Sequence, residues 1–176
     1  MLNRIVDDIK GSLESGHFFA ALTLALTLPD ICGKAEYPDE KSKKRYIQWF
    51  DDNIGDYDKE DADDLPYMSG EMIYNLRNSL LHQGTPNISA GDIKEEQCRV
   101  DRFLLTISDV SYGGISMLGK DMDDNVTGRG IEINIVNLCA EISRAAQMYY
   151  KRNIEKFDFF NYELRDMRKG NCKYWF

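Results

Sequence analysis

One predicted helix carries an arginine and a histidine whose chemistry is complementary. In the run GEMIYNLRNSLLHQG, Arg77 and Asn78 are followed by His82, one of only two histidines in the chain. An imidazole titrates near neutral pH and can accept or donate a proton. A guanidinium can hold a phosphate or a carboxylate through paired hydrogen bonds. Together these residue types would suit proton transfer beside a phosphate group.

The predicted surroundings of Arg77 are apolar. At ~100° per residue, four apolar or aromatic side chains lie within ~60° of Arg77 on the helical wheel: Ile73, Tyr74, Leu80 and Leu81. A buried cation is unfavourable unless an anion, a hydrogen-bonding partner or another subunit meets it. The opposite arc forms a polar stripe: Glu71, Asn75, Asn78 and His82.

The ends of this motif helix carry their own signals. Ser69 is a plausible N-cap, and Gly84 supplies the expected C-terminal end. On an ideal helix Arg77 and His82 point ~140° apart, so one copy does not make a compact site. A second copy, or local unwinding before Gly84, is needed to bring them together. The structural alternative is an arginine paired with a carboxylate and a histidine that caps the helix C-terminus.

The other elements follow from hydrophobic periodicity. We predict helices over 2–14, 17–28, 40–54 and 136–160 in addition to the motif helix. Residues 17–28 are apolar nearly all round, which favours the centre of a bundle. Pro29 and Gly33 predict a kink or a break before an extended stretch that reaches Pro38.

A small β element is expected after the motif helix. Apolar residues alternate over 103–108 and again over 131–135, and Gly113 and Gly114 are predicted to turn the chain between them. The expected fold is therefore mainly α, a bundle of about five helices with a β insert over about 99–135. We expect residues 1–176 to form a single domain.

Composition indicates a globular chain. No segment approaches the ~18 uncharged apolar residues of a membrane span, and the N-terminus lacks the pattern of a signal peptide, so we expect a cytoplasmic protein without a membrane partner. The net charge is −8, but residues 51–64 hold eight acids and one lysine. The remainder is nearly neutral, so the acidic balance does not by itself exclude a nucleic-acid partner. Basic clusters at 41–45 and 165–173 are either solvated helix surface or part of a binding face.

Other candidate sites are weaker. His17 is expected to be a polar residue at a helix start. Four oxygen-bearing residues match positions 1, 3, 5 and 12 of a calcium loop, but Val126 occupies the position that needs glycine: Asp121, Asp123, Asn125 and Glu132. The cysteines are scattered singly, without zinc-site pairs, and are expected to be reduced: Cys32, Cys98, Cys139 and Cys172. We expect no metal and no cofactor.

The motif in its helical setting resembles the HEPN (higher eukaryotes and prokaryotes nucleotide-binding) superfamily. Its members are small helical bundles with Arg-x4–6-His near the end of one helix and commonly a polar residue after the arginine, as Asn78 is here. With LTLPDICGKAEYP upstream and the strand insert downstream, the chain is similar to a bacterial, plasmid-type branch. The superfamily's toxins modified by a partner nucleotidyltransferase carry a tyrosine two residues after the histidine. Gly84 stands there instead, so that mode of control is not expected.

The resemblance implies a metal-independent endoribonuclease that acts as a homodimer through the motif helix. Arg77 and His82 would be the catalytic pair, with Asn78 as the polar residue of the motif, and RNA the substrate. A toxin or defence role, with an antitoxin or regulatory partner, is compatible with it. The alternative is a non-catalytic HEPN module that binds a protein or nucleotide partner in the same cleft. A purely structural helical protein would instead neutralise Arg77 within its own subunit.

Overall fold

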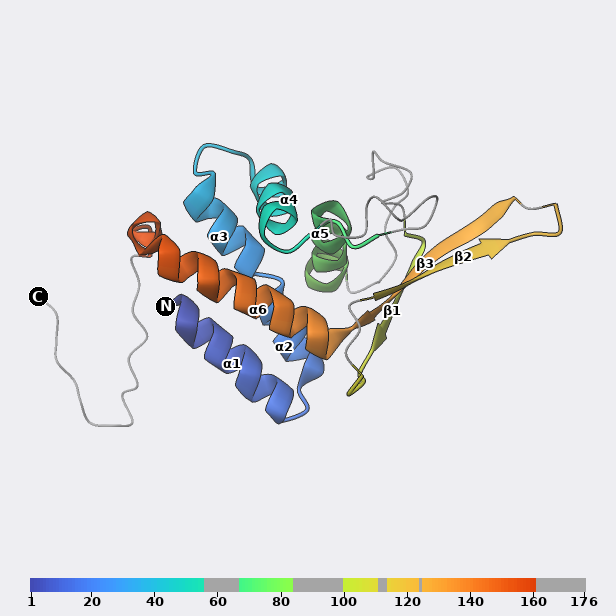
Figure 1. Ribbon diagram of the computed structural model, residues 1–176, viewed down its shortest axis with the longest axis horizontal. Helices are drawn as coiled ribbons and strands as arrows, with labels where there is room; N and C mark the ends of the chain where they lie inside the picture. The colour runs from blue at the N-terminus through green and yellow to red at the C-terminus, as the bar shows by residue number, and fades with distance from the viewer. Residues whose placement is uncertain (56–66, 84–99, 111–113, 124, 161–176) are drawn as a thin grey trace, which may run out of the picture.

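Helices dominate the molecule, and a small sheet lies at one end of it (Figure 1). The computed structural model describes residues 1–55, 67–83, 100–110, 114–123 and 125–160. Within these residues the predicted class, mainly α with a small β insert, is confirmed. The β2–β3 hairpin projects away from the helical body, whereas α6 crosses that body (Figure 1).

The first two helices pack against each other and are joined at a glycine. Helix α1 (Leu2–Glu14) matches the predicted range. Gly16 follows it with φ +73°, a left-handed conformation that favours glycine. Helix α2 (Phe18–Ala25) then begins. It buries Ala21, Leu22 and Ala25, but Phe19 is 66% exposed. The prediction of a helix buried all round is therefore wrong for one face of α2.

The extended stretch predicted after Pro29 is a helix instead. Helix α3 (Leu28–Glu36) places Pro29 in its first turn, where the missing N–H removes no helical hydrogen bond. Gly33 lies inside α3 because α4 (Ser42–Asn53) approaches closely there. A Cβ at residue 33 would lie 2.6 Å from the carbonyl oxygen of Arg45. The 40–54 helix was predicted correctly.

Together α2 and α3 trace a long apolar path. The path from Phe18 to Glu36 is long and apolar enough to cross a membrane by length and composition alone, and half of it is buried within the molecule. Asp30 and Lys34 interrupt this path, so it does not contradict the expectation that the chain lacks a run of ~18 uncharged apolar residues. Helix α6 packs against both α2 and α3, as expected of core helices in a globular protein.

The motif helix is α5 (Gly70–Asn78), and it begins where predicted. The Ser69 hydroxyl accepts a hydrogen bond from the backbone N–H of Met72 at 3.2 Å, which makes it the N-cap. Asp51 of α4 accepts a hydrogen bond from the Gly70 N–H at 2.6 Å. A π-helical segment, η1 (Ser79–Gln83), continues α5. The predicted stop at Gly84 lies outside the described residues.

The sheet has the order β1-β3-β2. Strand β1 (Arg102–Thr106) pairs in parallel with β3 (Val126–Asn134), and β2 (Gly114–Lys120) pairs antiparallel with β3. The predicted reversal at 113–114 is wrong in part, because Gly114 already belongs to β2, while Gly113 lies outside the described residues. The hairpin instead turns between Asp121 and Asn125, whose backbone N–H donates to the Asp121 carboxylate at 2.9 Å.

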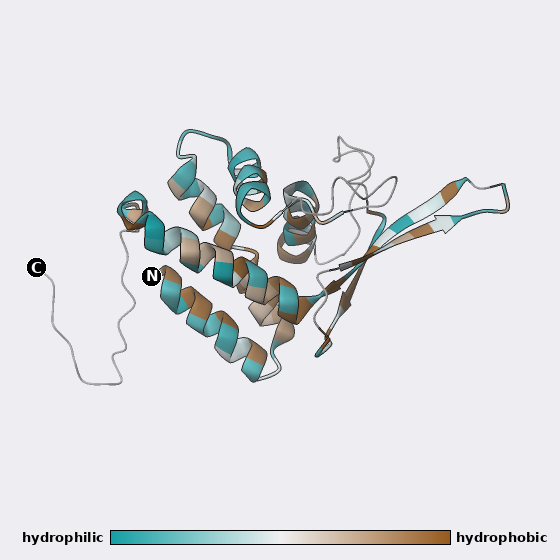
Figure 2. Ribbon diagram, viewed as in Figure 1, coloured by the Kyte–Doolittle hydropathy of each residue, from teal (hydrophilic) through white to brown (hydrophobic). Residues whose placement is uncertain are grey.

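Helix α6 (Ile135–Arg152) follows β3 without a loop. The predicted helix over 136–160 is shorter in the structure, because Asn153 leaves helical geometry and a 3-10 turn, η4 (Ile154–Phe157), follows. Apolar residues lie along α2, α3 and the start of α6 (Figure 2). Cys32 and Cys139 are free and buried, and burial raises the pKa of the Cys139 thiol to about 12. The other two cysteines lie outside the described residues.

Candidate functional site

Arg77 lies beside two tyrosine rings, one of which, Tyr74, belongs to its predicted apolar setting. Its side chain is 17% exposed. The guanidinium carbon lies 5.9 Å from the ring centre of Tyr46 and 5.8 Å from that of Tyr74. The two rings meet edge to face at 5.3 Å. These contacts provide cation–π attraction but no countercharge.

The countercharge comes from α3. Asp30 Oδ2 lies 3.8 Å from Arg77 Nη2, close enough for an ion pair and too far for a hydrogen bond. Asp30 Oδ1 accepts hydrogen bonds from Arg45 Nη2 at 3.1 Å and from Ser42 Oγ at 3.1 Å. Asp30 therefore binds Arg45 more closely than Arg77. The sequence did not predict that Asp30, Arg45 and Tyr46 would be neighbours of Arg77.

Asn78 serves the arginine directly. Its Oδ1 accepts a hydrogen bond from Arg77 Nη1 at 2.9 Å. The amide oxygen is thus already engaged, and it holds the end of the guanidinium. Asn78 could therefore position the arginine as well as contact a ligand through its NH₂ group.

The predicted polar stripe on the opposite side of α5 is not a solvent-exposed face. Asn75 is buried, with only 6% exposure, and its Nδ2 has no hydrogen-bond partner among the described residues. Glu71 is 16% exposed at its side chain and pairs with Lys43 Nζ at 3.0 Å. Helix α4 packs against α5 and covers part of this side.

His82 lies in η1, and its side chain is outside the described part of the structure. The backbone there still bears on the predicted geometry. A π-helix bonds residue i to i+5, so each residue turns by less than the ~100° of an α-helix. Only the steps that lie within η1 (Ser79–Gln83) are of this kind, so position 82 turns partway from its α-helical direction toward the side of Arg77. The sequence predicted either local unwinding here or a second copy, and the π turn is a local unwinding of the backbone.

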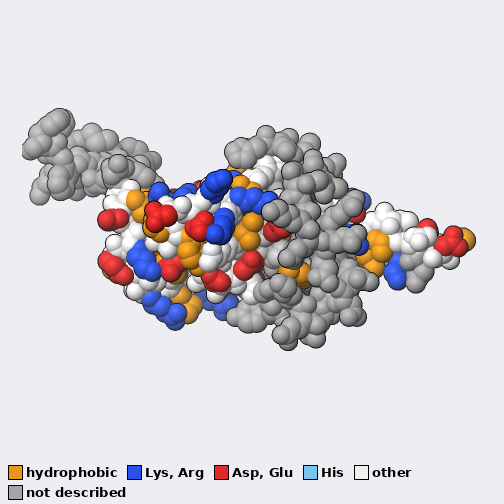
Figure 3. All heavy atoms as spheres, turned by 90° about the horizontal axis from the view of Figure 1, so that it is seen from above, with side chains coloured by type: hydrophobic (Ala, Val, Ile, Leu, Met, Phe, Trp, Pro, Cys, Tyr) orange, Lys and Arg blue, Asp and Glu red, His pale blue; other side chains and the backbone are white. Residues whose placement is uncertain are grey.

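The basic cluster over 41–45 is not a free cationic face. Lys44 pairs with Glu40, Lys43 with Glu71, and Arg45 with Asp30. On the face drawn in Figure 3, basic and acidic side chains are interspersed over the helical body. The second basic cluster, at 165–173, and most of the acidic loop at 51–64 lie outside the described residues.

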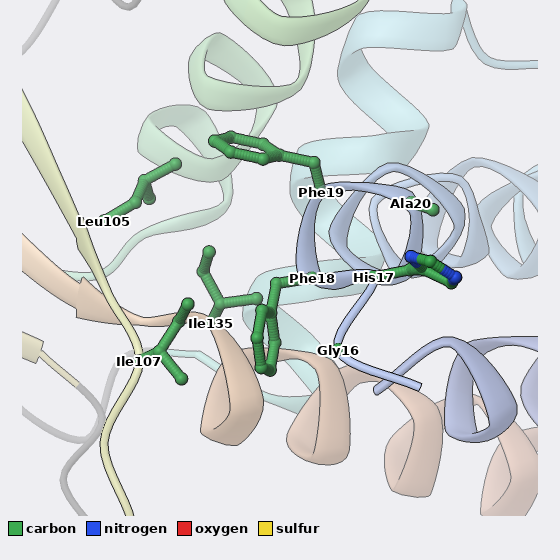
Figure 4. A pocket seen from close by; sticks show the side chains of 8 residues that line it. All are labelled: Gly16, His17, Phe18, Phe19, Ala20, Leu105, Ile107 and Ile135. Carbon is green, nitrogen blue, oxygen red and sulfur yellow. The ribbon is translucent and has the colours of Figure 1, made fainter. Parts of the chain in front are cut away.

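A separate hollow of about 420 Å³ opens beside the start of α2. Its lining is mainly apolar and includes Phe18, Leu105, Ile107 and Ile135. The His17 side chain points away from these residues (Figure 4). His17 occupies the N-cap position of α2 and makes no capping hydrogen bond through its side chain. This agrees with its prediction as a polar residue at a helix start.

Among the residues with described positions, no group of three or more His, Cys, Asp or Glu could hold a metal ion. Asp121, in the calcium-like count, instead caps its own turn. Hydrogen bonds from Asn125 are the main cause that lowers the pKa of the Asp121 carboxyl.

In comparisons with known proteins, no family model, curated protein or solved structure matches the chain.

Proposed function

We propose that the protein is a metal-independent endoribonuclease of HEPN type, cytoplasmic and active as a homodimer. The observation that carries the proposal is the environment of Arg77. Its guanidinium is largely desolvated, held by Asn78 and two tyrosine rings, and only partly neutralised by Asp30. A cation preorganised in this way is suited to stabilise developing negative charge on a phosphate.

The proposed reaction uses the substrate's own nucleophile. The ribose 2′-oxygen forms a bond to the adjacent phosphorus while its proton passes to His82. The bond from phosphorus to the 5′-oxygen breaks, and that oxygen receives a proton from the His82 of the second copy. Arg77 stabilises the dianionic phosphorane. The products would be a 2′,3′-cyclic phosphate and a 5′-hydroxyl, and DNA would not react because it lacks the 2′-hydroxyl.

The decisive experiment compares purified wild type with His82→Ala on one labelled RNA. We expect the variant to lose ~10²-fold or more of the cleavage rate, the scale of a lost general acid or base. Arg77→Ala should lose a comparable amount, and Asn78→Ala less. His17→Ala is the matched control, because it removes the other histidine from an exposed helix start, and should cleave like wild type.

Chelation tests the metal-independent mechanism. Cleavage should persist in EDTA, since His82 and Arg77 supply the proton transfer and the positive charge. Cleavage that EDTA abolishes and a divalent ion restores would contradict this mechanism. Equal cleavage by wild type and His82→Ala would contradict the catalytic assignment.

The second candidate is a non-catalytic module that binds a partner through the same surface. The contact between Asp30 and Arg77 favours a role without catalysis, because a structural arginine is expected to meet a carboxylate of its own subunit. It fits the purely structural helical protein as well as this module. Absence of cleavage by wild type across a broad panel of RNAs would support this candidate over the ribonuclease.

A further inference from the structure

Asp30 is shared unequally between two arginines. Its Oδ1 accepts from Arg45 Nη2 at 3.1 Å, from Arg45 Nε at 3.3 Å and from Ser42 Oγ at 3.1 Å. Its Oδ2 lies 3.8 Å from Arg77 Nη2. One carboxylate oxygen is thus saturated, whereas the other faces a guanidinium that it does not reach with a hydrogen bond.

The edge of Arg77 nearest to Asp30 has unused donors. Nη1 is bound to Asn78, but Nε is buried without a hydrogen-bond partner among the described residues. Nε and Nη2 together form the fork through which arginine binds carboxylate or phosphate oxygens in pairs. A buried donor left unpaired is unfavourable by ~1–3 kcal/mol, so an oxyanion at this edge would be stabilised.

Among the described residues, two cations meet one anion here. Arg45 and Arg77 bring two cations to one carboxylate, and all three side chains are less than a third exposed. Tyr46 does not compensate, because burial strongly raises the pKa of its phenol, which donates to the Leu26 carbonyl at 3.1 Å. The neighbouring pair of Lys43 and Glu71 is balanced within itself.

We infer that Arg45 and Arg77 form one phosphate-binding site, with Asp30 as the counter-ion that holds both guanidiniums until a phosphate enters. A phosphoryl oxygen would contact Arg77 Nη2 first, because Nε is shielded from solvent, and Arg45 would provide the second cation. Asp30 competes with the ligand for both arginines. The inference deepens the proposed function, on which it rests for its biological role, by adding Arg45 as a second phosphate-binding residue.

The test is a titration of the intact protein with inorganic phosphate, read as a rise in Tm, against chloride at matched ionic strength. Arg45→Gln and Arg77→Gln should each weaken phosphate binding ~10-fold or more, as expected for a lost charge-assisted hydrogen bond. Asp30→Asn should bind phosphate several-fold more tightly because the competitor is neutral. Arg4→Gln, an exposed arginine of α1, is the matched control and should bind like wild type.

The outcomes separate this inference from the proposed function. It is overturned if phosphate raises the Tm no more than chloride does, or if Arg45→Gln and Arg77→Gln keep wild-type affinity. If a variant does not fold, NMR of the wild-type protein replaces it. The Nε–H signals of Arg45 and Arg77 should then shift when phosphate is added, and unchanged signals would overturn the inference. Adenosine monophosphate and a 2′-O-methyl RNA oligomer distinguish a free nucleotide from an RNA backbone as the phosphate source. If the protein binds phosphate but does not cleave RNA, only the proposed ribonuclease activity is refuted. If Arg45→Gln cleaves RNA with the KM of wild type, only the role of Arg45 in phosphate binding is refuted.

Discussion

At the scale of single residues, a few buried polar side chains do more than one task. Asn134 is fully buried at the junction of β3 and α6. Its Oδ1 accepts from the Val136 N–H at 3.0 Å, and its Nδ2 donates to the carbonyls of Ser108 and Val110. The same side chain therefore caps α6 and fixes the segment that follows β1.

Asn134→Ala should lower the free energy of unfolding by ~1–3 kcal/mol, because it removes the helix cap and the two hydrogen bonds that the buried Asn134 amide donates. Urea unfolding followed by circular dichroism measures the loss. Asn3→Ala, on the exposed face of α1, is the matched control and should stay within ~0.5 kcal/mol of wild type. Similar losses in both variants would mean that the Asn134 hydrogen bonds do not stabilise the fold.

At the scale of elements, the spacing of α3 and α4 depends on Gly33. Gly33→Ala would place a methyl group 2.6 Å from the Arg45 carbonyl oxygen, so the helices must separate, and we expect a loss of ~1–3 kcal/mol. Gly11→Ala in α1 meets nothing within 4 Å and should gain ~0.5–1 kcal/mol from helix propensity. Thermal unfolding of both variants should show a lower Tm for Gly33→Ala and a higher Tm for Gly11→Ala. A higher Tm for both would contradict the close contact between α3 and α4.

Helices α3 and α6 and the turn η4 meet at Glu36, and the stability that this junction provides should depend on pH. The Glu36 carboxylate accepts from Lys156 Nζ at 2.6 Å and from the Tyr149 hydroxyl. The hydrogen bond from Lys156, followed by that from Tyr149, lowers the pKa of Glu36 in the folded state. The folded protein therefore binds this proton more weakly than the unfolded chain, and the stabilisation is complete above the ordinary glutamate value of about 4.3.

As the pH falls through the lowered pKa of Glu36, that stabilisation should be lost. Glu36→Gln should reduce stability at pH 7 by roughly 1 kcal/mol, a value kept small because the ion pair is partly exposed, and its Tm should fall less steeply with acid than that of wild type. Glu14→Gln, from an exposed pair, is the control. Parallel curves of Tm against pH for wild type and Glu36→Gln would contradict a stabilising role of the ionised Glu36 carboxylate.

What the sequence could predict was local. The range of α1 and the core of α4 follow from periodicity, and the Ser69 cap follows from a side chain that lies three residues before its donor. The partner of Arg77 could not be found in this way, because Asp30 lies far away along the chain and is brought close only by the packing of the helices. Pro29 was misread as a helix breaker, since a proline pattern does not say whether it stands inside or at the start of a helix. The parallel pairing of β1 with β3 is likewise non-local.

At the scale of the whole molecule, the oligomeric state is the main proposal to test. Asp30 gives Arg77 a partner within its own subunit, so the arginine alone no longer requires a second copy. The homodimer rests on the resemblance and on the arrangement of Arg77 and His82 on one helix. We expect an interface on the order of 1,200 Å² or more in total, and sedimentation velocity at micromolar concentration should detect the dimer. A monomer there would contradict it.

The π turn of η1 also bears on the spacing of the motif. An i→i+5 turn contains one residue more than an α-helical turn, so deleting Leu81 would let the segment close as an ordinary α-helix. The histidine would then stand four residues after Arg77, and residues i and i+4 of an α-helix lie on one face. A protein with one residue fewer should therefore keep its helical content and still hold the histidine on the side of Arg77. A spacing of five residues with a π turn and a spacing of four residues with an α-helical turn are thus two ways to bring these residue types to one side of the helix.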